Sequence, residues 1–194
     1  MHGLLPMVQH WGYLAVFIGV MLESTGVPVP GETFIVLASF LAAQHALNPW
    51  EVYAAAVLGA ILGDNLGYAV GRFGGRKLVR RLSAIGHVPS ERIDSAERWF
   101  RHYGPAAVFF GRFIALLRML SGPMAGLSRM PWLEFLSFNA LGGLVWAGLV
   151  VWLSLLIGQT VLTYFHEADE ALLALVLLPI VWLSLRFIWR RIRR

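Results

Sequence analysis

Residues 23–32 read ESTGVPVPGE and interrupt an apolar stretch that runs from about residue 7 to residue 47. Two prolines and two glycines so close together cannot continue a helix. A helix needs about 20 residues to cross the hydrocarbon core of a bilayer, and residues 33–47 are too few to do so. The segment therefore predicts a re-entrant helical hairpin. The alternative is a plain spanning helix followed by a short interfacial one.

The rest of the chain is also unusually apolar. Of its 194 residues, 58% are hydrophobic and 14% are charged, whereas a soluble domain is about 25% charged. A chain of this length has too little interior to hide so much apolar surface from water. The composition excludes a soluble enzyme and a disordered chain, and it predicts an all-α integral membrane protein of one domain. The absence of cysteine excludes disulfides, iron–sulfur clusters and thiolate zinc sites.

Basic residues indicate which segment ends face the cytoplasm. Eight of the sixteen lie within residues 72–101 and five lie within residues 186–194, so both blocks, including the C-terminus, should be cytoplasmic. Charge gathered at segment ends argues against nucleic-acid binding. With both basic blocks on the cytoplasmic side, the apolar segment 104–127 must enter and leave the membrane on that same side. It therefore predicts a second re-entrant hairpin, folded back near residues 121–123. Two units of hairpin plus span would then form an inverted repeat, as in many secondary transporters.

The chain divides into hairpins, spans and a basic linker. We expect the first hairpin and span at about 7–72, and the linker at about 73–103. The second hairpin and span follow at about 104–162, the last span at about 172–189 and a basic tail at 190–194. Within the linker, residues 90–103 predict an amphipathic helix with one apolar face. That face carries Ile93, Ala96, Phe100 and Tyr103. We expect this helix to lie on the cytoplasmic membrane surface; the alternative is a solvated charged linker.

Five ionisable side chains fall inside or beside the apolar segments. They are Glu23, Glu32, Asp64, Arg112 and Arg118. A single charge at the bilayer centre costs at least ~2.5–3.5 kcal/mol, so these groups should pair or face water. We expect the two glutamates of the first hairpin to face the two arginines of the second in a hydrated polar centre. The arginines would point about 120° apart on one unbroken helix, so a shared ligand requires a break between or beside them.

Each charged residue also has a structural interpretation. The arginines could extend to the cytoplasmic headgroups, Glu32 could cap a helix, and Glu23 could be an ion-pair partner. Asp64 could be a polar clasp between helices. The histidines lie at segment ends and in loops without metal-ligand spacing, and the sequence predicts neither a metal site nor a cofactor. A structural membrane protein without transport would leave the five costly charges unexplained.

Three ordered motifs run through the chain. They are Glu23-Ser24-x3-Pro28-x-Pro30-Gly31-Glu32, Gly63-Asp64-x3-Tyr68-x2-Gly71-Arg72 and Gly111-Arg112-Phe113-Ile114-x3-Arg118-x6-Ala125-Gly126. Over about residues 10–160 the chain resembles the DedA family, the bacterial relatives of SNARE-associated, or VTT-domain, membrane proteins. It departs from the family pattern at Ala115, where many relatives carry proline.

The resemblance implies a lipid transporter of the bacterial inner membrane, not an enzyme, with two re-entrant hairpins in an inverted repeat. The expected cargo is undecaprenyl phosphate, returned to the cytoplasmic leaflet with a proton or sodium gradient. An alternative is a flippase or scramblase for phosphatidylethanolamine. A membrane lipid phosphatase is less favoured, because no histidine lies within the break at residues 23–32 or within residues 104–127. The expected partners are a membrane lipid and H⁺ or Na⁺, and the chain is a candidate homo-oligomer.

Matched by position, the resemblance assigns lipid-phosphate binding to Arg112 and Arg118. It assigns ion coupling to Glu23 and Glu32. Possible accessory residues are Asp64, Tyr68 and Arg72. Arginine supplies planar donors suited to phosphate, and the glutamates would compete with phosphate for them. Protonation of the glutamates would release the arginines to bind phosphate.

Overall fold

Helices make up all of the regular structure in the region that the structure describes. The computed structural model describes residues 4–27, 29–85 and 89–165. These residues form seven helices and no β-strand, which confirms the all-α prediction for this part of the chain. The predicted last span at 172–189 and the basic tail at 190–194 lie outside the described residues.

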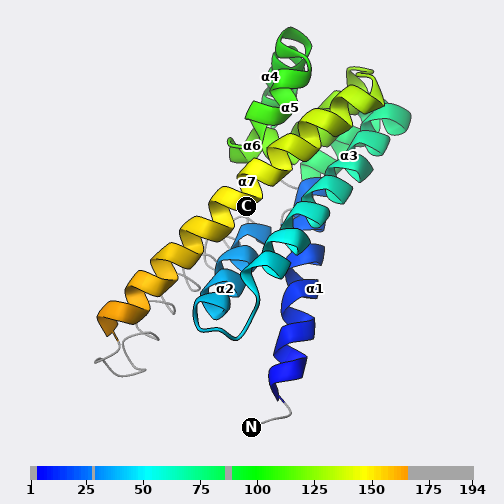
Figure 1. Cartoon of the computed structure of the whole chain (residues 1–194). Helices are drawn as coiled ribbons and strands as arrows, with labels where there is room; N and C mark the ends of the chain where they lie inside the picture. The colour runs from blue at the N-terminus through cyan, green and yellow to red at the C-terminus, as the bar shows by residue number, and fades with distance from the viewer. Residues whose placement is uncertain (1–3, 28, 86–88, 166–194) are drawn as a thin grey trace.

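The first two helices form a hairpin around the segment rich in proline and glycine (Figure 1). Helix α1 covers Leu4–Thr25 and α2 covers Gly31–Ala43, so the predicted helix break is present between them. Gly26 has a φ of 104°, a left-handed conformation that glycine adopts readily and that ends α1. The two helices lie side by side, because Gly19 of α1 packs against the ring of Phe34 of α2.

Helix α3, Pro49–Ile85, runs through the centre of the fold and contacts both hairpins. It carries a glycine at every fourth position over one stretch, at Gly59, Gly63, Gly67 and Gly71. Backbone atoms of α1 approach the first two of these glycines, and Pro123 of the second hairpin lies against the other two. Small residues at this spacing let membrane helices approach closely. The stripe therefore holds an element of each hairpin against α3.

The second hairpin consists of α5 and α6. Helix α5 covers Pro105–Gly111 and α6 covers Ala115–Leu127, which puts the break at residues 112–114. The predicted fold-back near residues 121–123 is therefore wrong. Pro123 lies inside α6, where the missing side chains of the facing α3 glycines leave room for its ring. Membrane helices tolerate proline where neighbouring helices compensate for it, so α6 continues through this residue.

Helix α4, Ser90–Tyr103, has the bounds that the sequence predicts, but its apolar face packs against other helices of the protein. Ile93, Ala96 and Phe100 are buried in a cluster with side chains of α3, α5 and α6. The prediction that this face lies on the membrane is therefore wrong, and Tyr103 is exposed instead of sharing it. Helices α4 to α6 gather at one end of the molecule (Figure 1).

A kink in α3 precedes the contact with α4. Gly75 has a φ of 62° and a ψ of −172°, a conformation that favours glycine. Just beyond the kink, Arg76 donates hydrogen bonds to Asp94 at 3.2 Å and to Glu97 at 2.6 Å, both on α4. The kink thus lets the end of α3 meet the polar face of α4.

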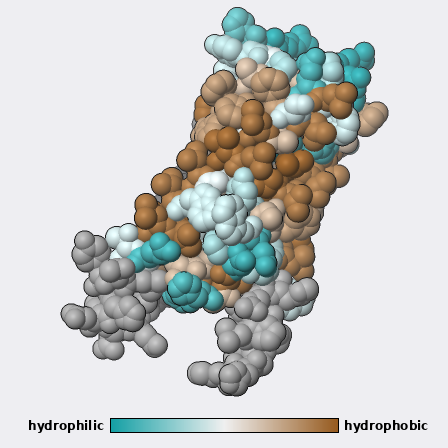
Figure 2. Space-filling model, in the orientation of Figure 1, coloured by the Kyte–Doolittle hydropathy of each residue, from teal (hydrophilic) through white to brown (hydrophobic). Residues whose placement is uncertain are grey.

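Helix α7, Trp132–Phe165, crosses the molecule and packs against α2, α3 and α5. Among the described residues, two helical stretches are long and apolar enough to cross a membrane, namely Pro49–Val79 of α3 and Trp132–Thr160 of α7. Figure 2 shows apolar surface across the middle of the molecule and hydrophilic residues at the end that carries α4. This distribution agrees with a membrane protein.

We expect Gly126→Ala in α6 to destabilise the fold. The new Cβ would lie 2.7 Å from the backbone nitrogen of Arg72, and overpacking of this kind costs about 1–3 kcal/mol of unfolding free energy. Thermal unfolding of the purified protein in detergent measures the effect. The matched control is Gly148→Ala, whose Cβ would lie 3.6 Å from Tyr53 Cε2, an ordinary contact distance. Equal melting temperatures for the two variants would contradict close packing of α3 on α6.

Candidate functional site

The two hairpins meet through one arginine and two glutamates. Glu23 is in the last turns of α1, Glu32 is in the first turn of α2, and Arg118 is in the first turn of α6. Arg118 Nη2 donates to Glu23 Oε1 at 2.7 Å, and Nη1 donates to Glu32 Oε1. The guanidinium also lies 4.6 Å from the ring centroid of Trp146 on α7, within range of a cation–π interaction. Four helices therefore contribute to the surroundings of this guanidinium.

The Arg118 site is open toward the side of Glu32. The side chain of Arg118 is 6% exposed and that of Glu23 is 18% exposed, whereas that of Glu32 is 49% exposed. Val36 lies four residues after Glu32, so both side chains share one face of α2, and Val36 is also exposed. The opening thus combines a carboxylate with an adjoining apolar surface.

The second arginine has different partners. Arg112 lies in the break between α5 and α6, and its Nη2 donates to Asp64 Oδ2 on α3 and to Asn139 Oδ1 on α7. The side chains of Arg112 and Asp64 are both 0% exposed. The expected arrangement, with both glutamates facing both arginines, is therefore wrong for Arg112. From its position in the break, the Arg112 side chain extends toward α3 and α7, and the carboxylate of Asp64 balances its charge.

One face of α7 supports both guanidiniums. Asn139 and Gly143 are four residues apart, and Trp146 follows three residues later, a spacing that puts all three on one helical face. A Cβ on Gly143 would lie 3.4 Å from Arg112 Nη1, and one on Gly142 would lie 2.9 Å from Arg112 Cδ. Sequence reasoning did not select these residues. The available signal was a polar residue and a glycine pair within a long apolar run.

The accessory candidates Tyr68 and Arg72 have different surroundings, one buried and one exposed. Tyr68 is buried, donates a hydrogen bond from its hydroxyl to the carbonyl of Met130 at 2.6 Å, and stacks on Phe135. The side chain of Arg72 is exposed. Tyr68 therefore ties α3 to the start of α7, and Asp64 is the accessory candidate that the fold brings to an arginine.

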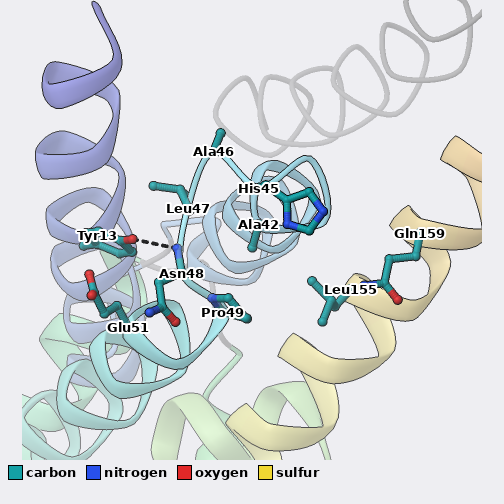
Figure 3. Close-up of a pocket in the computed structure, with 10 residues that line it drawn as sticks. All are labelled: Tyr13, Ala42, His45, Ala46, Leu47, Asn48, Pro49, Glu51, Leu155 and Gln159. Atoms are coloured by element: carbon teal, nitrogen blue, oxygen red, sulfur yellow. Dashed lines mark hydrogen bonds between the residues drawn. The ribbon is translucent and has the colours of Figure 1, made fainter.

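A separate hollow of about 520 Å³ lies at the turn between α2 and α3 (Figure 3). Tyr13, His45, Asn48 and Glu51 are among its lining residues, and the backbone N–H of Asn48 donates to the Tyr13 hydroxyl at 2.8 Å. Neither lysine nor arginine is among the described residues that line it. Because charge-assisted hydrogen bonds from arginine or lysine are the strong ones to phosphate, the cluster around Arg118 is the better candidate. The described residues also contain no group of three His, Asp or Glu side chains that could hold a metal.

Comparison with known proteins assigns the family. The profile of the VTT domain matches residues 29–156. The chain belongs to the DedA family of VTT-domain membrane proteins. An uncharacterized membrane protein of Synechocystis is 46% identical to this DedA chain over 155 residues, which is 80% of this chain and 71% of the relative.

Two further relatives of the DedA chain have functional names. Undecaprenyl phosphate transporter A of Bacillus subtilis is 26% identical over 188 residues, which is 97% of this chain and 93% of that protein. An alkaline phosphatase-like protein of Lactococcus lactis is 32% identical over 161 residues, which is 80% of this chain and 75% of that protein. No solved structure matches the chain. The family assignment confirms a membrane protein, and Glu32, Asp64 and both arginines lie within the matched region.

Proposed function

We propose that this DedA-family protein moves a lipid across the bacterial inner membrane by holding its phosphate headgroup. The observation that carries the proposal is a buried guanidinium, Arg118, at the meeting point of the two hairpins, held there by Glu23 and Glu32. A phosphomonoester carries about −1.5 to −2 charges near neutral pH, so it cannot cross hydrocarbon without a cationic partner. Arg118 supplies planar donors suited to that group.

The preferred cargo is undecaprenyl phosphate, returned to the cytoplasmic leaflet. The name of the Bacillus subtilis relative supports this choice. The second candidate is phosphatidylethanolamine. It is favoured by the two carboxylates beside one guanidinium, because Glu32 could hold the amine while Arg118 holds the phosphate. Transport of either lipid is proposed in preference to phosphate-ester hydrolysis, since the described histidine side chains, His45 and His102, are exposed and lie at the α2–α3 turn and on α4.

The proposed cycle couples headgroup binding to a cation. Glu23 and Glu32 occupy the donors of Arg118 in the absence of cargo. Protonation of these carboxylates would free the guanidinium for phosphate, so a proton gradient, or a sodium gradient that neutralises the same charges, would drive transport. In this proposal both hairpins are re-entrant and form an inverted repeat. The basic end of the molecule and the C-terminus are cytoplasmic.

Identification of the lipid that copurifies with the protein tests the proposal. We expect mass spectrometry of protein purified in nanodiscs from bacterial membranes to show enrichment of undecaprenyl phosphate over the bulk lipid extract. An enrichment of phosphatidylethanolamine would favour the second candidate. A lipid composition equal to that around an unrelated membrane protein, purified in the same way, would contradict both. Release of inorganic phosphate from the bound lipid would instead favour the phosphatase.

A further inference from the structure

We propose that Arg112 is a positioning residue that does not contact the phosphate. In this proposal Arg112, Asp64 and Asn139 form a closed clasp that fixes the break of the second hairpin, and thereby sets Arg118 opposite the glutamates. The proposal rests on the proposed function, because it assigns headgroup binding to Arg118 and assigns the positioning of Arg118 to Arg112. It replaces the phosphate contact that the family resemblance implies for Arg112.

The first argument is enclosure. The guanidinium of Arg112 is fully buried and its charge is balanced by a fully buried carboxylate of Asp64. Its Nη2 donates to both Asp64 and Asn139, and α7 approaches the guanidinium at Gly143. A headgroup could reach this guanidinium only if α3 and α7 separated. The Arg118 site has a half-exposed carboxylate, Glu32, as one of its walls.

The second argument is charge. Arg112 and Asp64 form a pair of equal and opposite charges, whereas Arg118 contacts two carboxylates. The two carboxylates together carry one negative charge more than Arg118 can balance. One cation can neutralise that charge while the other carboxylate still pairs with Arg118. Protonation of Asp64 would instead leave Arg112 as an isolated buried cation, which is a costly state. Exchange of ligands therefore suits Arg118, and a permanent ion pair suits Arg112.

The third argument is the direct connection between the break and Arg118. The backbone N–H of Arg118 donates to the carbonyl of Ile114, in the break, at 2.8 Å. Phe113 and Ile114 are exposed while Arg112 is buried, so Arg112 is the side chain of the break that anchors it to the interior. A displacement of the break would move the first turn of α6, and Arg118 with it.

The unpaired atoms of the clasp agree with this role. Within the described residues, Nε and Nη1 of Arg112 and Oδ1 of Asp64 have no hydrogen-bond partner. Two donors and one acceptor on two adjoining buried side chains suit water, which can serve both kinds of atom. A phosphate would satisfy the donors but would be repelled by Asp64. The chemistry of the leftover atoms therefore favours a neutral molecule over an anion.

Three variants separate a clasp from a phosphate ligand: Asp64→Asn, Arg112→Gln and the charge-balanced double variant Asp64→Asn/Arg112→Gln. The probe is farnesyl phosphate, a short polyprenyl monophosphate, and its binding to the full chain in nanodiscs is measured by calorimetry beside the melting temperature. Breaking a buried ion pair on one side is costly, so we expect each single variant to lower both the melting temperature and the probe affinity, the latter by about tenfold or more. We expect the double variant to recover an affinity within about threefold of the wild type, since coupled residues are not additive.

A phosphate-binding Arg112 would give the opposite pattern. Asp64→Asn would then free Arg112 and raise the probe affinity, and the double variant would bind as weakly as Arg112→Gln. Either result would overturn the clasp. Arg118→Gln separates this failure from a failure of the proposed function: normal binding by Arg118→Gln would refute the proposed function. Lost binding by Arg118→Gln together with lost binding by a folded double variant would refute the clasp alone.

Discussion

Arg118→Gln is expected to abolish measurable lipid transport. Truncation of one member of a buried, hydrogen-bonded charge pair costs about 2–5 kcal/mol, or between about 30-fold and about 4,000-fold in affinity. Arg118 contacts Glu23, Glu32 and the ring of Trp146, so its loss removes the proposed headgroup donors and leaves two carboxylates that repel phosphate. The measurement is the rate at which proteoliposomes move a fluorescent short-chain prenyl phosphate between leaflets.

Two further variants make this result specific. Arg118→Lys keeps the charge but loses the planar fork of donors, and we expect it to transport at an intermediate rate. Arg98→Gln is the matched control, because Arg98 is exposed on α4 and donates to Ser95, and we expect it to transport as the wild type does. Full activity in Arg118→Gln, with the variant folded, would refute headgroup binding at this site.

Glu23→Gln/Glu32→Gln is expected to remove most of the pH dependence of phosphate binding. A phosphate placed on Arg118 adds negative charge beside both carboxylates and so favours their protonation, and by reciprocity protons favour phosphate. Affinity in the wild type should therefore rise as the pH falls, by up to about tenfold per pH unit for each proton taken up. Glutamine keeps an oxygen that can accept from Arg118 but cannot bind a proton.

The double glutamine variant also corrects for the titration of the ligand. A phosphomonoester has its own second pKa near about 6, and this contribution is the same in wild type and variant. The difference between the two pH profiles of farnesyl phosphate binding therefore belongs to the glutamates. Glu134→Gln, at an exposed position in the first turn of α7, is the matched control. Identical dependence of affinity on pH in the wild type and the double glutamine variant would exclude proton coupling at this pair. A sodium gradient would then remain as the proposed driving force.

Several features followed from the sequence because each has a strong local cause. Two prolines and two glycines within 23–32 leave little freedom for a helix, and the break lies there. The bounds of α4 follow from its amphipathic pattern. The contact of Glu23 and Glu32 with an arginine of the second hairpin follows from the cost of unpaired charge in hydrocarbon, and both contact Arg118.

Other features depend on the neighbours that the fold supplies. Pro123 resembles a helix breaker in isolation, but the glycines of α3 make room for its ring. The true break surrounds Arg112, where the cause is tertiary: a buried guanidinium that reaches Asp64 and Asn139. The apolar face of α4 is equally ambiguous from sequence, because a protein interior and a bilayer both bury Phe100 and its neighbours. Periodicity indicates that a face is buried and cannot indicate what buries it.

The exposed face of α2 has a consequence for the size of the cargo. Glu32 and Val36 stand on the same side of that helix, so the polar opening continues directly into surface that suits hydrocarbon. A lipid whose phosphate rests inside can leave its chain among the neighbouring acyl tails. The proposed transport then needs no tunnel as long as an eleven-isoprene chain, and the number of isoprene units sets no steric limit on the proposed cargo.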